Sequence, residues 1–173
     1  MLSQDKNNIL IALNDVLDKL ETQVKNNSDA VLFKDKGEKW NNAQIIDHLA
    51  ISFGITAIGF ASPKFLLKAI GGQLGRNKRN YDEVVFQYQL KLNEGAKAPL
   101  PYLPKISLIK NKTVLDNFWN ANKTALLKSI DTWNDKDLDV FVLPHPILGK
   151  TTLREMLYFT IYHCKHHLQQ MDK

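Results

Sequence analysis

Apolar residues recur along this chain at steps of three and four positions, the spacing that places side chains on one face of an α-helix. Four long segments show this pattern, and we expect each to form an amphipathic helix: residues 4–24, 42–61, 112–133 and 152–171. The second segment is nearly free of charged residues, so it is predicted to be the most buried helix. Because no segment shows sustained strand alternation, the pattern predicts an all-α protein.

Three of these helices begin at residues that can cap them. Ser3 is a candidate N-cap for the first helix. Asn41 with Gln44, and Thr152 with Glu155, have the spacing of a capping box, in which each side chain bonds the backbone N–H of the other residue. We therefore expect the second helix to begin at residue 42 and the fourth near residue 152.

A connection of residues 62–111 separates the second and third predicted helices. Loops of that length without structure are uncommon in compact domains, so we expect short helices over residues 64–70 and 81–92. The proline-rich segment 98–104 is expected to lie extended across the bundle, where it could wall a pocket. No internal repeat or second domain boundary is visible, and residues 1–173 are predicted to form a single domain.

Composition narrows the class of protein. An apolar content of 44% suits a globular fold, and the single cysteine excludes an intrachain disulfide. The chain does not open with a charged and then apolar leader, so we expect a cytoplasmic protein. The longest uncharged run, residues 49–63, falls short of the roughly 20 apolar residues that cross a bilayer, so we expect a buried helix there and no membrane partner.

The net charge of +5 is concentrated in one stretch. Residues 76–112 carry eight basic and three acidic side chains, a difference of five that equals the whole excess. Such a stretch can attract nucleic acid or an acidic small molecule, although a solvated face is its ordinary meaning. No known nucleic-acid-binding module accompanies it, so no nucleic acid partner is expected.

Two histidines in the fourth predicted helix, His163 and His167, lie one turn apart and can converge on one metal ion. His48 in the second helix lies on the flank of its apolar stripe and is the candidate third ligand. Zinc proteases have a glutamate after the first histidine of such a pair, and Cys164 stands there instead, so a protease is not expected. The competing readings are hydrogen-bonded core histidines, and a closed site with Cys164 as a fourth ligand.

Other polar residues on these two helices are candidates for supporting roles. Ser52 and Thr160 lie on the histidine flanks, where they could orient ligands or substrate, and His166 turns further toward solvent as a surface or second-shell residue. Asp47 is expected to project away from His48. No general base is evident, so the catalytic residues stay unassigned.

The chain also resembles the DinB/YfiT-like family. Its segment Trp40-Asn41-Asn42-Ala43-Gln44-Ile45-Ile46-Asp47-His48-Leu49 is similar to the W-x(4)-I-x-x-H-L pattern of that family, and two later segments, 145–155 and 163–171, are similar to its closing HPxxGxxTxxE and HxxHHxxQ patterns. The matching motifs span residues 40–171, with 71–105 unmatched between them.

This resemblance implies an up-down four-helix bundle with a long crossover between helices two and three, often paired as a homodimer. It implies a divalent metal, commonly zinc or nickel, held by His48, His163 and His167, whereas His145 would lie at the turn before the fourth helix and bind no metal. Some members of the family transfer low-molecular-weight thiols, one isomerises maleylpyruvate, and many have no assigned activity.

We therefore expect a metal-dependent enzyme acting on a small molecule, as a thiol transferase or a hydrolase. The alternative is a non-catalytic bundle that binds a small molecule or anion, and a nucleic-acid binder is the third reading. If the basic crossover, residues 71–112, roofs the metal site with Arg76, Lys78 and Arg79, the ligand should be an anionic thiol or acid.

Overall fold

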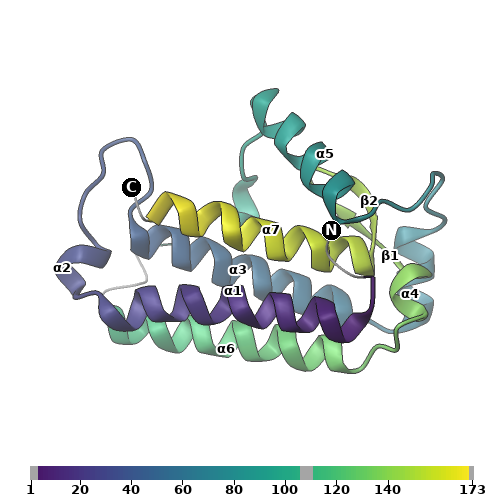
Figure 1. The fold of residues 1–173 in the computed structure, drawn as a ribbon, viewed down its shortest axis with the longest axis horizontal. Helices are drawn as coiled ribbons and strands as arrows, with labels where there is room; N and C mark the ends of the chain where they lie inside the picture. The colour runs from purple at the N-terminus through teal and green to yellow at the C-terminus, as the bar shows by residue number, and fades with distance from the viewer. Residues whose placement is uncertain (1–3, 106–110, 172–173) are drawn as a thin grey trace.

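Four long helices lie side by side in the computed structural model, which describes residues 4–105 and 111–171 (Figure 1). They are α1 (Lys6–Asn26), α3 (Asn42–Ala61), α6 (Lys112–Asp131) and α7 (Leu153–Met171). α3 packs along α6, α1 packs along α7, and contacts between α3 and α7 join the two pairs. The protein is mostly helical, as predicted, and the up-down order of the four helices stays a prediction.

Both predicted capping boxes are present. The Asn41 side chain accepts a hydrogen bond from the Gln44 backbone N–H (2.9 Å), and the Gln44 side chain accepts one from the Asn41 backbone (2.8 Å). Thr152 and Glu155 make the equivalent pair at 3.1 and 3.3 Å. These bonds satisfy backbone donors that the first turn of a helix leaves unpaired, and they set the starts of α3 and α7.

Two helix ends differ from the prediction. Helix α1 begins at Lys6 because Asp5 caps it; Ser3, the predicted cap, lies outside the described residues. Helix α6 ends at Asp131, before the predicted Trp133, whose indole Nε1 donates to the Phe60 carbonyl (2.8 Å). The indole therefore anchors the end of α6 to the end of α3.

Helix α3 is the central helix of the core. Most of its residues are buried, and its Phe53 packs against Trp119 of α6 with ring centroids 5.2 Å apart. Among the described helices, α3 alone is long and apolar enough to cross a membrane, with 61% of the relevant window buried inside the fold. Core helices meet the same criterion, so this property identifies α3 as the predicted buried helix without indicating a membrane.

The connection between α3 and α6 is ordered over its described length. It contains α4 (Lys64–Gly71) and α5 (Tyr81–Asn93), which confirm the two short helices expected there, and a 3-10 turn η1 (Leu100–Tyr102). Helix α5 lies against α7, at the top of Figure 1. The proline-rich segment is thus not fully extended as predicted. A further short helix, α2 (Asp29–Leu32), joins α1 to α3.

A β-hairpin precedes α7 and was not predicted. It follows a 3-10 turn η3 (Asp137–Asp139) and consists of β1 (Val142–His145) paired antiparallel with β2 (Gly149–Thr152). Gly149 has a φ of +70°, a conformation that L side chains rarely adopt. Gly71 at the end of α4 lies so close that a Cβ there would stand 2.0 Å from the Val142 carbonyl oxygen. The hairpin is therefore packed tightly against α4.

A buried ion cluster ties the connection to the start of α7. The Glu155 carboxylate is fully buried and accepts hydrogen bonds from Arg76 at 2.9 and 2.6 Å, and from the backbone and guanidinium of Arg79 at 2.7 and 3.1 Å. Burial alone would raise the pKa of Glu155, but the hydrogen bonds from Arg76 and Arg79 outweigh it and the pKa lies below the ordinary 4.5. Glu155 is therefore ionised at neutral pH.

Replacing Glu155 with Gln should lower the free energy of unfolding by about 3 kcal/mol at neutral pH, because two arginines lose a buried counter-ion. A lowered folded pKa gives stability that is complete above the unfolded value of 4.5 and is lost as pH falls through the folded pKa. Denaturant unfolding from pH 7 to pH 3 should thus show the variant approaching wild type on acidification. The exposed Glu38→Gln is the control, and equal effects of both changes would contradict a structural role for the cluster.

Candidate metal centre

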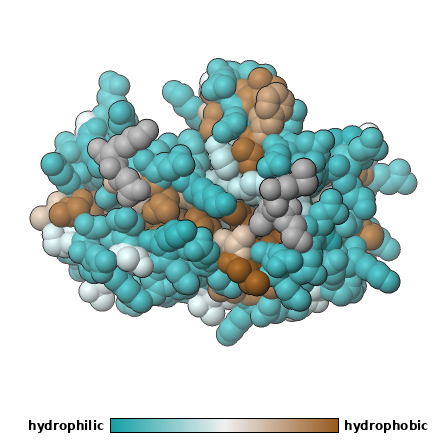
Figure 2. Space-filling view, viewed as in Figure 1, coloured by the Kyte–Doolittle hydropathy of each residue, from teal (hydrophilic) through white to brown (hydrophobic). Residues whose placement is uncertain are grey.

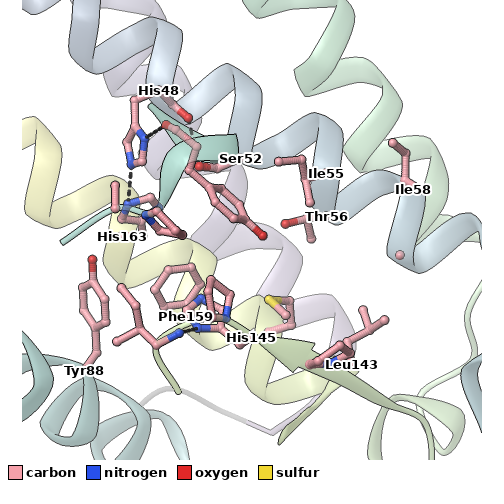
Figure 3. Close-up of a pocket in the computed structure, with 18 of the residues that line it drawn as sticks. His48, Ser52, Ile55, Thr56, Ile58, Tyr88, Leu143, His145, Phe159 and His163 are labelled. Atoms are coloured by element: carbon pink, nitrogen blue, oxygen red, sulfur yellow. Dashed lines mark hydrogen bonds between the residues drawn. The ribbon is translucent and has the colours of Figure 1, made fainter. Parts of the chain in front are cut away.

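Three histidine side chains converge where α3 meets α7. His163 Nε2 lies 3.1 Å from His48 Nε2 and 3.0 Å from His167 Nε2, and the three candidate ligand atoms lie within 4.8 Å of one another. All three residues are buried, and Figure 3 shows His48 and His163 facing each other across the helix contact. The structure thus brings together the three histidines that the sequence singled out.

Two of these rings are held in one tautomer by their outer nitrogens. His48 Nδ1 lies 2.6 Å from the Tyr102 carbonyl oxygen, and His167 Nδ1 lies 2.8 Å from the Gln170 amide oxygen. An oxygen of this kind only accepts, so each Nδ1 carries the proton. In a neutral ring, the Nε2 of His48 and of His167 is then unprotonated, and its lone pair points at His163.

The environment keeps these rings neutral. Burial lowers the pKa of His48, and burial together with the neighbouring histidines lowers the pKa of His167 to about 3 and that of His163 well below 6.5. When all three rings are neutral, the one proton of His163 can lie in only one of its two short Nε2–Nε2 contacts, so at least one contact has no hydrogen bond in the metal-free protein. A buried cluster of acceptors with too few protons favours a cation.

The two separations from His163 Nε2 also suit a single ion. With metal–nitrogen bonds of about 2.1 Å, two ligands at right angles lie about 3.0 Å apart and two at the tetrahedral angle about 3.4 Å apart. The observed 3.0 and 3.1 Å fall at the lower end of this range. Nδ1 hydrogen bonds such as those to Tyr102 and Gln170 are the usual support of metal-binding histidines. The residues present therefore fit a divalent cation.

Aromatic residues surround the cluster. The Trp40 ring lies 4.9 Å from His48 and 6.2 Å from His167, measured between centroids. The Tyr88 ring of α5 lies 6.2 Å from His163, and Figure 3 shows its hydroxyl directed toward the histidines. Burial, followed by the nearby Tyr162, raises the pKa of Tyr88 to about 12. Its hydroxyl therefore keeps its proton at neutral pH.

Sequence reasoning assigned no role to four of the supporting groups. Trp40 and Gln170 are residues of the family motifs quoted above, and this membership was the signal that could have marked them as part of the site. Tyr88 was visible only as one member of an apolar face. The Tyr102 acceptor is a backbone carbonyl, which no residue type could have indicated, because its place depends on the path of the crossover.

The residues predicted to support the site, Ser52, Thr160 and His166, do not all contact the histidine cluster. Ser52 and His166 line the cavity next to the histidines, but the Ser52 hydroxyl donates to the His48 carbonyl (2.9 Å). Thr160 donates to the Met156 carbonyl (2.8 Å) and does not line the cavity. His166 is half-buried, and its Nε2 accepts from the Gln170 amide (3.0 Å). Gln170 thus links His166 to His167, whereas Ser52 and Thr160 bond within their own helices.

Two further expectations concern neighbours of the histidines. Cys164 is fully buried in the core and lies outside the candidate metal group; burial raises the pKa of its thiol. This argues against a closed four-ligand site. Asp47 does not bond His48, as expected, and its buried carboxylate accepts a hydrogen bond from the Lys105 backbone N–H. Asp47 therefore helps to hold the crossover that positions Tyr102.

A cavity of about 380 Å³ adjoins the histidines, and the crossover forms part of its wall through Ala98, Pro99 and Tyr102. The expectation that basic side chains roof the site is wrong for Arg76 and Arg79, which bond Glu155 at the start of α7. Lys78 is exposed and lies 3.9 Å from Asp139, and Lys110 lies outside the described residues. The crossover thus contributes backbone and apolar surface to the site.

Comparison with known proteins gives one finding. The family model described as the DinB superfamily matches residues 12–171, which include all three histidines of the cluster and the two residues, Tyr102 and Gln170, that bond the Nδ1 atoms of His48 and His167. Comparisons with curated proteins and with solved structures gave no match.

Replacing Gln170 with Leu should weaken the binding of a divalent cation by about 10- to 100-fold, because His167 loses the acceptor that holds its proton on Nδ1. The neighbouring Gln169→Leu is the matched control, since Gln169 is exposed and has no role in the cluster. Competition titration against a chromophoric chelator measures both affinities. Equal affinities for the two variants would show that Gln170 does not support the site.

Proposed function

Since the chain belongs to the DinB superfamily, we propose that it is a metal-dependent enzyme whose three histidines, His48, His163 and His167, hold one divalent cation. The observation that carries the proposal is the proton shortage within the cluster, where three Nε2 atoms converge and two of them are bare lone pairs. Zinc and nickel are the proposed ions, because imidazole suits both. Three protein ligands leave positions open for a substrate or water.

A divalent cation bound there would act as a Lewis acid and would lower the pKa of a water or thiol toward neutrality. The chain's own residues prepare the site for such chemistry. Trp40 and Phe159 pack against the imidazoles, and Tyr88 offers a protonated hydroxyl on the cavity side. We propose thiol transfer or hydrolysis of a small molecule as the reaction class.

The competing function is a non-catalytic bundle that binds a small molecule. One observation favours it: the described residues that line the cavity include no aspartate or glutamate, so no carboxylate is available there as a general base. Metal content together with turnover separates the two functions. We propose that nucleic acid is not a partner, because Glu155 engages two of the crossover's arginines. The cytoplasmic location and the absence of a membrane partner stay predictions from the sequence.

Purified protein should hold about one divalent cation per chain, measured by mass spectrometry of the metal. His163→Ala should lose most of this metal, whereas His166→Ala should lose little, because His166 bonds only Gln170. The loaded protein should then be assayed with thiol-transfer and hydrolysis substrates. Equal metal loss from both variants would mean that the ligand set is wrong, and a loaded protein without turnover would favour the binding function.

We also propose that the chain forms a homodimer through the apolar surface of α5 and η1. Phe86 and Leu90 of α5 are 60% and 39% exposed and Leu100 of η1 is 81% exposed, and Figure 2 shows apolar side chains gathered over α5. Exposed apolar patches on soluble proteins mark interaction surfaces.

Light scattering after size exclusion should give about twice the mass of one chain for the wild type and a single-chain mass for Phe86→Glu, because a charge at an apolar interface is costly to bury. Ile11→Glu, at an exposed residue of α1, is the control and should remain dimeric. A monomeric wild type would rule out the dimer.

A further inference from the structure

The cavity beside the histidines extends away from them into an apolar region (Figure 3). This region is lined by side chains from α3, α4, the hairpin and α7, namely Ile55, Ile58, Leu67, Ile70, Leu143 and Met156. The whole cavity, including its histidine end, has a volume of about 380 Å³, more than twice the roughly 150 Å³ of an apolar cavity that holds one benzene molecule. The space therefore suits a ligand larger than a single aromatic ring.

No charged side chain lines this cavity among the described residues. Its lining consists of aliphatic and aromatic residues, histidines and a few hydroxyls, without aspartate, glutamate, lysine or arginine. Ile58 and Ile70, at the outer end of the apolar region, are 72% and 57% exposed. A carboxylate placed further in, against the buried Leu67 and Met156, would lose its hydration without gaining a counter-ion, which is strongly unfavourable. The cavity thus selects against a charged body in its ligand.

His145 provides a fixed hydrogen-bond donor in this cavity. Its Nδ1 accepts from the backbone N–H groups of Ile147 and Leu148 at 3.1 and 3.0 Å, so the ring proton must lie on Nε2. His145 lines the cavity and only 8% of the residue is exposed, and no side chain or backbone group in the described part of the chain bonds its Nε2. This N–H is therefore available to an acceptor on a ligand in the cavity.

A second hollow, unlike the cavity, has charged side chains along it and also reaches the histidine cluster at His167. This hollow shares only Trp40 and His167 with the cavity, and Lys34, Lys36 and Lys39 lie along it. Asp35 and Glu38 lie along it as well, so its charges are mixed. A ligand with carboxylates would have to approach from this side.

We infer that the cavity binds an uncharged ligand with an apolar body, whose carbonyl or hydroxyl oxygen accepts a hydrogen bond from His145 Nε2. The reactive end of the ligand, for which a thiol is the simplest case, faces His48, His163 and His167. The placement of this reactive end rests on the proposed metal-dependent function. The apolar body and the acceptor depend on the cavity alone, so the two parts can be tested separately.

The first experiment compares two thiols of the same shape on zinc-loaded and on nickel-loaded protein by isothermal titration calorimetry. Para-methylbenzyl thiol should bind at least about tenfold more tightly than para-carboxybenzyl thiol, because only the second brings a charge into the apolar region. Equal affinities, or a preference for the carboxylate, would overturn the inference and would point to the mixed-charge hollow as the ligand route.

The second experiment uses metal-free protein and ligands that need no metal. Acetophenone should bind about two- to tenfold more tightly than isopropylbenzene of similar shape, since only the ketone accepts the His145 hydrogen bond. If both bind equally, the role of His145 is wrong. If neither ligand binds the metal-free protein, but the separate metal analysis finds one divalent cation per chain, the cavity inference fails and the proposed function stands. If acetophenone binds and the metal analysis finds no cation, the proposed function fails and the cavity inference stands.

A variant adds the counter-ion that the native cavity lacks. Thr56 lines the cavity from α3 and is partly exposed, so Thr56→Lys should reduce the preference for para-methylbenzyl thiol by about tenfold or reverse it. The matched control is Thr124→Lys on the exposed face of α6, which should keep the wild-type preference. An unchanged preference in a folded Thr56→Lys protein would contradict the placement of the ligand, and the wild-type comparisons decide the inference if this variant does not fold.

Discussion

The arrangement of the site depends on a shortage of protons among three buried imidazoles. His48 and His167 place their protons on the outer nitrogens, where a carbonyl and an amide oxygen receive them, so the inner nitrogens face His163 as acceptors. Packing must hold this repulsive arrangement in the metal-free protein. A cation that binds only the folded chain would relieve it and would add to the stability of the fold. Folding and metal binding are therefore expected to be coupled.

The crossover between α3 and α6 holds this arrangement in place by its backbone more than by its charges. The Tyr102 carbonyl receives the His48 proton, and the Lys105 N–H bonds the buried Asp47 carboxylate one residue before His48. At the other end of the crossover, Arg76 and Arg79 bond Glu155. Two attachments, one to α3 and one to α7, thus close the crossover over the contact between these helices.

Engagement of the arginines by Glu155 changes what the site can recognise. A basic stretch in a sequence suggests an anion-binding surface, but here two of its arginines, Arg76 and Arg79, neutralise a buried carboxylate. The cavity wall consequently carries no fixed charge in the described residues, and recognition there depends on apolar contact and on a few oriented donors, of which His145 and Tyr88 are two. The charged side chains of the crossover thus pair at the start of α7, whereas the cavity beside the α7 histidines is lined by none of them.

The sequence by itself determined the helices and the histidine set. Periodic apolar residues and the two capping boxes predicted α3 and α7 closely, because these signals act between residues a few positions apart. It missed the hairpin, whose four-residue strands are too short to show a periodic pattern and contain Pro144. Only the tertiary structure decided that the Tyr102 carbonyl holds the His48 proton, and that the arginines bond Glu155 rather than a ligand. These contacts join residues 54 to 79 positions apart, and such pairings depend on how the crossover packs, which no local pattern encodes.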